Sequence, residues 1–148
     1  MYPTEETLAF KLLLLLEVIH KTPEKELKEL GITYGNYISL RMIYDEEGIT
    51  QAGLAARQHK DRNVIGQVVD KLEKKKYIRR VGDENDRRIY RLYLTEDGRQ
   101  AVECNWEEML QGETKLLQRL TEDENQLLKK LLDKMLEPEK TEQSGMCN

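Results

Sequence analysis

The stretch that decides the fold is residues 61–94, DRNVIGQVVDKLEKKKYIRRVGDENDRRIYRLYL. At about 100° per residue, residues 61–76 form a helix with an apolar side, which includes Val64, and an opposite polar side. From Ile78 the period changes to two, which predicts two short strands joined by a turn at 82–86. In the second strand, Tyr90 is expected in the same buried row as residues 92 and 94. This stretch therefore predicts one helix followed by one hairpin.

Positive charge gathers in the same stretch. Residues 57–91 hold twelve lysines and arginines against six acidic residues, although the 148-residue chain has a formal net charge of −4. The acidic total argues against an indiscriminate coating of nucleic acid. The local excess beside a polar helix face favours a directed contact with duplex DNA.

Two shorter helices are expected before this stretch. Thr33 begins one that Gly48 closes, Thr50 begins another over 51–58, and Asp61 caps the helix that follows. The order of helix, turn, helix and hairpin predicts a mainly α-helical chain with a small β-hairpin, arranged as a winged helix-turn-helix.

Leucine-rich helices flank this unit. Residues 7–21 are apolar nearly all round, and residues 122–136 place leucine and methionine in a near-heptad repeat. Such helices must be covered, and a second subunit is the natural cover. One long helix is expected from Thr95 to Leu120. The predicted parts are an N-terminal dimerisation helix and connector at 1–31, the winged helix-turn-helix at 32–98, C-terminal dimerisation helices at 99–137 and a disordered tail at 138–148.

Several other classes of protein find no support in the sequence. Cys104, Cys147, His20 and His59 have no metal-ligand spacing, so we expect neither a metal nor another cofactor. The most apolar run, residues 8–19, is too short for a membrane span, and the acidic start lacks a signal peptide, so a cytoplasmic location without membrane contact is expected. The sequence shows no nucleophile with its base, no carboxylate pair and no phosphate loop, so we do not expect an enzyme.

Four segments and the helix from Asp61 carry a resemblance to a known family: GITQAGLAAR at 48–57, KLEKKKYIRR at 71–80, DRR at 86–88 and LYLTEDG at 92–98. They resemble the DNA-binding core of the MarR family of bacterial transcription regulators, closely over 32–98 and in layout alone elsewhere. The resemblance implies a homodimer with interlocking terminal helices. Each subunit would present one winged helix-turn-helix to half of a pseudo-palindromic operator.

The predicted DNA-binding residues of the helix are Arg62, Asn63, Gln67, Lys71 and Lys74. The first three can reach base edges in the major groove, where Asn and Gln suit adenine and Arg suits guanine. Gly66 leaves a gap in this face that favours close approach to DNA. The interpretation as phosphate neighbours or solvated surface applies to Lys74, Lys75, Lys76, Arg79 and Arg80. Family members more often carry a small hydroxyl residue at 63 and Arg at 67, so the operator sequence does not transfer.

Asp86, Arg87 and Arg88 are the DNA-binding candidates of the hairpin. The resemblance implies that Arg88 enters the minor groove and that Asp86 orients it, or a neighbouring arginine, through an ion pair. Narrow minor grooves concentrate negative potential, which suits arginine.

Tyr34, Tyr37 and Tyr44 are weaker candidates, for a cleft in which many relatives bind small aromatic or anionic ligands. Three tyrosines on one helix are more often core and rim. Cys104 is expected to be inert and partly buried, because peroxide-sensing relatives carry their thiol on the first helix.

These observations predict a dimeric, sequence-specific DNA-binding transcription regulator, a repressor released by a small ligand. The alternative is a winged-helix module whose basic face binds an acidic protein. A protein-binding face usually carries exposed apolar anchors, and the predicted polar face shows none.

Overall fold

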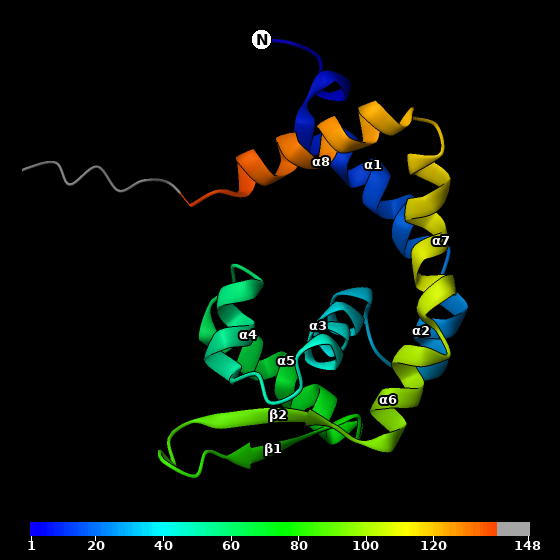
Figure 1. Ribbon diagram of the computed structural model, residues 1–148. Coiled ribbons are helices and arrows are strands. Elements are labelled where there is room, and N and C mark those ends of the chain that lie inside the picture. The colour runs from blue at the N-terminus through cyan, green and yellow to red at the C-terminus, as the bar shows by residue number, and fades with distance from the viewer. Residues whose placement is uncertain (139–148) are drawn as a thin grey trace, which may run out of the picture. The chain divides into compact units, whose positions relative to one another are not determined.

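The computed structural model of the protein describes residues 1–138, and the predicted tail lies outside this range from residue 139 onwards. The chain is mainly helical with one two-stranded antiparallel hairpin, as predicted (Figure 1). It packs as two compact units, residues 1–113 and a second that begins at Thr114. The elements are a 3-10 turn at Thr4–Glu6, α1 at Leu8–Lys21, α2 at Glu24–Leu30, α3 at Tyr34–Asp45, α4 at Gln51–Arg57, α5 at Arg62–Lys74, β1 at Ile78–Gly82, β2 at Tyr90–Leu94, α6 at Glu96–Glu103, α7 at Trp106–Leu117 and α8 at Glu122–Leu136.

Polar side chains fix where the helices of the first unit begin. Thr33, Thr50 and Asp61 each accept a hydrogen bond, at 2.7–3.1 Å, from a backbone N–H two or three residues further on. Such N-caps satisfy backbone donors that a helix start leaves unpaired. The three predicted caps of α3, α4 and α5 are confirmed.

α3, α4, α5 and the hairpin share one hydrophobic core. Ile65, Val69 and Leu72 of α5 are fully buried in it, which anchors the helix by its apolar side. The prediction was wrong for Val64, which is 45% exposed because it lies at the edge of the apolar stripe in the first turn. Other fully buried side chains are Tyr37, Leu40, Ile43, Leu54 and Leu92.

The hairpin is half inside the core and half beyond it. Its register pairs Ile78 with Leu94 at one end and Gly82 with Tyr90 at the other. Leu92 and Leu94 are buried as expected, but Tyr90 is 48% exposed. The hairpin turn lies at the end remote from α6 (Figure 1), and Val81 and Ile89 at that end are exposed. The hairpin thus projects its turn as a wing.

The expectation of a single long helix after the hairpin was also wrong, because the chain turns between α6 and α7. Here the side-chain amide of Asn105 donates to the carbonyl of Ala101 at 2.9 Å. The Asn105 backbone N–H bonds the carbonyl of Val102, three residues back, at 3.4 Å. Asparagine often interrupts helices by such local hydrogen bonds.

Close backbone packing explains one glycine of α6. A Cβ placed on Gly98 would lie 1.9 Å from the carbonyl oxygen of Tyr77. No side chain fits at that distance, so α6 rests directly on the backbone that leads into β1.

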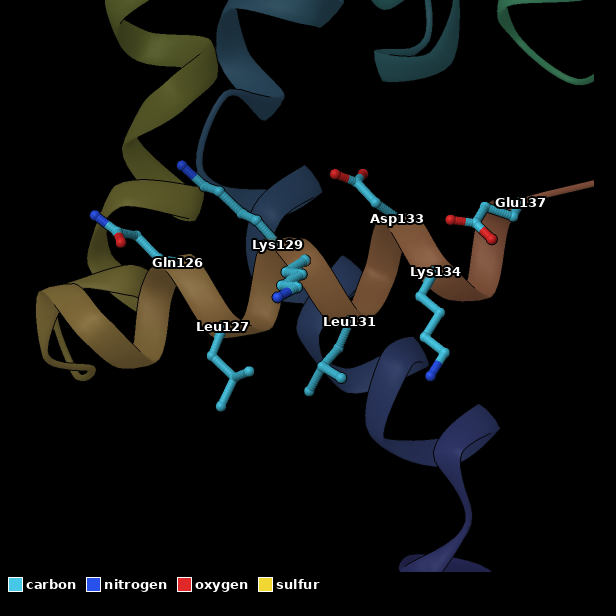
Figure 2. Close-up of a pocket in the computed structure, with 8 residues that line it drawn as sticks. Gln126, Leu127, Lys129, Leu131, Asp133, Lys134 and Glu137 are labelled. Carbon is cyan, nitrogen blue, oxygen red and sulfur yellow. The ribbon is translucent and has the colours of Figure 1, made fainter.

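The terminal helices expose apolar surface. No residue of α1 is buried, although most of its side chains are apolar. α8 begins with the predicted capping box, in which Thr121 and Glu124 bond each other's backbone N–H. Leu127 and Leu131 project from one side of α8, opposite to Lys129 and Asp133, which are also solvent-exposed (Figure 2). Within residues 1–138, no helix has the length and apolar character that crossing a membrane requires.

Candidate nucleic-acid interface

The five predicted residues of α5 lie on its exposed surface. The side chains of Arg62, Asn63, Gln67, Lys71 and Lys74 form no hydrogen bond or ion pair with the described part of the chain. Their donors and acceptors therefore remain available to an external partner. Because the opposite side of the helix is buried, this face is held rigidly toward solvent.

Val64 adds an apolar side chain to this surface. Sequence reasoning missed it because the helical stripe assigned it to the core. A valine beside base edges suits the methyl group of thymine. One such residue does not make the cluster of apolar anchors that a protein-binding hot spot needs.

Arg80 is neither solvated surface nor a free phosphate neighbour. Its guanidinium pairs with Asp70 through Nη2 and with Glu73 through Nη1, the latter at 3.2 Å. Its Nε donates to Oε1 of Gln51 at 3.4 Å, and its backbone N–H donates to Glu73 at 3.2 Å. Arg80 thus joins β1 to α5 and to the first residue of α4.

Gly66 faces α4 in this arrangement. A Cβ at position 66 would lie 3.3 Å from Nε2 of Gln51. The missing side chain therefore leaves room for the Gln51 amide. Its predicted benefit for close approach to DNA remains a prediction.

The wing carries exposed arginines. Arg87 and Arg88 lie in the turn, and the Arg88 side chain is 94% exposed. The predicted ion pair with Asp86 is present but long, at 3.9 Å between Nε and Oδ1. The same Oδ1 accepts the backbone N–H of Arg88 at 3.0 Å. Asp86 therefore shapes the turn more than it holds the guanidinium.

A stronger tie holds the base of the wing. Arg91 donates from Nε to Oδ1 of Asp83 at 2.8 Å and from Nη1 to the carbonyl of Gly48 at 2.9 Å. Asp83 Oδ2 also accepts the backbone N–H groups of Asn85 and Asp86. The hydrogen bond from Arg91 lowers the pKa of Asp83 and raises the pKa of Arg91.

Sequence reasoning missed the Asp83–Arg91 pair. One signal could have found it: these opposite charges occupy diagonal positions across the turn, where long side chains can reach each other. The pair joins the wing to the turn between α3 and α4.

The tyrosine candidates occupy three different settings. Tyr37 is fully buried, its hydroxyl donates to the carbonyl of Val102 at 3.0 Å, and burial raises its pKa to about 12. The hydroxyl of Tyr44 donates to Glu103 at 2.9 Å, which raises the pKa of Tyr44. Tyr34 is half-buried and stacks on His20 with ring centroids 4.7 Å apart. Tyr37 thus serves the core, and a ligand-binding role for the three stays a prediction.

Two further predictions concern a metal site and the cysteine thiols. Cys104 is exposed, where partial burial was expected, and Cys147 lies outside the described residues. Among residues 1–138, no three histidine, cysteine or acidic side chains gather in a way that could hold a metal ion.

Comparison with known proteins identifies the family. The sequence profile of the MarR family matches residues 30–89. The HTH-type transcriptional regulator YybA of Bacillus subtilis is 30% identical over 110 residues, which cover 74% of this chain and 73% of YybA. The chain belongs to the MarR family.

Solved structures of MarR-family proteins agree with this assignment. The Staphylococcus aureus MepR–DNA complex matches with a TM-score of 0.79 and 26% identity, over 88% of this chain and 96% of MepR. The crystal structure of MarR matches with a TM-score of 0.73 and 27% identity, over 91% of this chain and 92% of MarR. The winged helix-turn-helix fold predicted from the sequence is confirmed.

Proposed function

We propose that this MarR-family protein is a dimeric transcription regulator that binds a pseudo-palindromic DNA operator by sequence. The observation that carries the proposal is the rigid face of α5, whose polar side chains have no partner among the described residues, beside a basic wing. The structural similarity to MepR, which was solved with DNA, supports the same reading.

Each part of this surface suits a different part of the duplex. The major groove, about 12 Å wide, admits a helix, so Arg62, Asn63 and Gln67 at the start of α5 would read bases. Lys71 and Lys74, further along the helix, would contact phosphates. Arg88 at the exposed tip of the wing would enter the minor groove, with Arg87 and Asp86 beside it.

The proposed dimer uses the terminal helices. α1 exposes seven large apolar side chains over 8–18, and α8 exposes six over 127–136. So many exposed apolar side chains on one helix favour a protein–protein interface at each of the two helices. We assign 1–31 and 99–137 to dimerisation and 32–98 to DNA binding. Two copies related by a twofold axis would place their α5 helices about 10 bp, or a small multiple of it, apart on the duplex.

Regulation belongs to the same proposal. We infer a repressor, released by a small aromatic or anionic ligand near Tyr34 and Tyr44, and acting in the cytoplasm without catalytic activity. The relatives' names are those of transcription regulators, which are not enzymes.

Selection of bound sequences from random DNA tests the proposal. We expect a motif with two related halves, together with a dimer in sedimentation at micromolar concentration. A protein that sediments as a monomer and still protects a single half-site would contradict the dimeric mode of binding. Recovery of no motif would contradict sequence-specific binding.

A further inference from the structure

A hollow separates α5 from the wing. It is lined by the beginning of α4, with Gln51, by Arg62 at the start of α5, and by Arg88 and Tyr90 of the wing. Two arginines therefore face this hollow from different elements. The two positive charges of its lining favour a negatively charged partner.

The proposed function determines what passes through this hollow. In a duplex, one sugar-phosphate strand separates each major groove from the adjacent minor groove. If α5 occupies the major groove and the wing the minor groove, the strand between the grooves must cross the space between α5 and the wing. The side chains that line the hollow would then face phosphates, which carry no base sequence.

Gln51 is a neutral hydrogen-bonding residue of this lining, and a hydrogen bond from Arg80 fixes the orientation of its side chain. Its Oε1 accepts from Nε of Arg80, and the Arg80 guanidinium is itself fixed by Asp70 and Glu73. Because Oε1 is engaged, the amide presents Nε2 as its free donor. No hydrogen bond joins Nε2 to any of residues 1–138, and Nε2 lies beside Gly66, where a Cβ would stand 3.3 Å from it.

We propose that Nε2 of Gln51 donates a hydrogen bond to a phosphodiester oxygen of the strand in this hollow, and that Arg80 is the positioning residue that orients the amide. The inference rests on the proposed function and deepens it. Arg80 acts through Gln51 and contributes no phosphate contact of its own, because the two carboxylates neutralise its charge.

The Gln51→Glu variant gives the sharpest test. A carboxylate at position 51 can still accept from Arg80, so thermal stability should be unchanged or slightly raised. It offers no donor and repels the phosphate. We expect at least tenfold weaker binding to operator and random duplex alike, because a hydrogen bond to a charged group is lost and a charge repulsion is added.

The matched control is Gln100→Glu, which adds the same charge at an exposed position of α6. It should bind both duplexes nearly as the parent does. If Gln51→Glu binds like Gln100→Glu, Gln51 does not face a phosphate and the proposal is overturned.

A double-mutant cycle tests the role of Arg80. Gln51→Ala and Arg80→Met should each weaken binding about tenfold, and the double variant should be no weaker than either, because one contact is lost in all three. The slope of log affinity against log salt concentration should stay that of the parent, since a neutral donor releases no counterion. Additive losses, or a slope flattened by about 1 in Arg80→Met, would show that Arg80 contacts a phosphate directly.

Thermal unfolding of every variant separates binding from folding. Should Arg80→Met fail to fold, Gln51→Glu and Gln51→Ala still decide whether the amide contacts DNA, and Arg80→Lys decides the positioning role. Lysine keeps the positive charge of Arg80 but has no Nε to bond the Gln51 amide, so Arg80→Lys should bind DNA like Gln51→Ala. Binding by Arg80→Lys as tight as that of the parent would overturn the positioning role of Arg80. A parent that binds no duplex selectively contradicts the proposed function, whereas a selective parent with an inert Gln51 contradicts this inference alone.

Discussion

The recognition helix α5 and the wing both present basic, exposed side chains, but they are held in different ways. Three fully buried side chains of α5, Ile65, Val69 and Leu72, fix it in the core. The wing turn lies beyond the core. It is held by the Asp83–Arg91 ion pair and by the hydrogen bond from Arg91 to the carbonyl of Gly48. Close packing in the core contributes to the stability of the whole fold, whereas an exposed ion pair contributes little to that stability. Changes behind α5 should therefore alter folding, and changes in the wing should alter DNA binding alone.

The largest effect is expected from Leu72→Ala. Removing a fully buried leucine leaves a cavity and should lower the free energy of unfolding by about 2–5 kcal/mol. Thermal or denaturant unfolding measures the loss. The volume-conserving Leu72→Met is the control and should cost less than about 1.5 kcal/mol. If Leu72→Ala also lost less than about 1.5 kcal/mol, α5 would not be anchored by the core.

Gln67→Ala tests what the exposed face of α5 reads. It should weaken operator binding by about 1–3 kcal/mol and leave random DNA almost unaffected, because a base contact is lost. The control, Lys74→Ala, should weaken binding to both duplexes and reduce the slope of log affinity against log salt concentration by about 1. Equal losses on both duplexes for Gln67→Ala would remove this residue from base reading.

Arg88→Ala tests the wing. Operator affinity should fall by at least about tenfold, or about 1.4 kcal/mol, with dimerisation and thermal stability nearly unchanged. Arg88→Lys should restore part of the loss, because an ammonium is more strongly hydrated than a guanidinium. Titration of labelled operator at fixed salt measures all three proteins. Parental affinity in Arg88→Ala would show that this arginine contributes nothing to binding.

Asp83→Asn should have the smallest effect. It loosens the base of the wing, so operator affinity should fall less than in Arg88→Ala. The pKa of Asp83 in the folded protein lies below its ordinary value of 3.8. The stabilisation that the ionised carboxylate gives to the wing is therefore complete above pH 3.8, and it is lost only as the pH falls through the lowered pKa. The difference between parent and variant should therefore be constant from about pH 5 to 8. A difference that changes within this range would point to another titrating group.

The sequence was informative where structure is local. Thr33, Thr50 and Asp61 were predicted as caps because an N-cap bonds backbone two or three residues away. The buried side of α5 followed from helical periodicity, except for Val64 at its edge. These features need no knowledge of the partner elements.

Features that depend on distant partners could not be predicted in this way. The bonds of Arg80 reach α4 and α5, and Arg91 reaches Gly48, which is 43 residues away in the chain. A charged residue in a basic stretch looks the same whether it is engaged or free. The turn between α6 and α7 was missed because the local bonds of Asn105 outweigh the apolar periodicity around it.

The contact of Gly98 with Tyr77 has a consequence for mutational tolerance. Most packing contacts can adjust when a neighbouring side chain changes, but here the obstacle is a backbone carbonyl 1.9 Å from where any Cβ would stand. No second substitution can move that oxygen without moving β1. In a library of all single variants, position 98 should accept glycine almost alone, whereas the exposed Glu84 and Asn85 of the wing turn should accept nearly every residue.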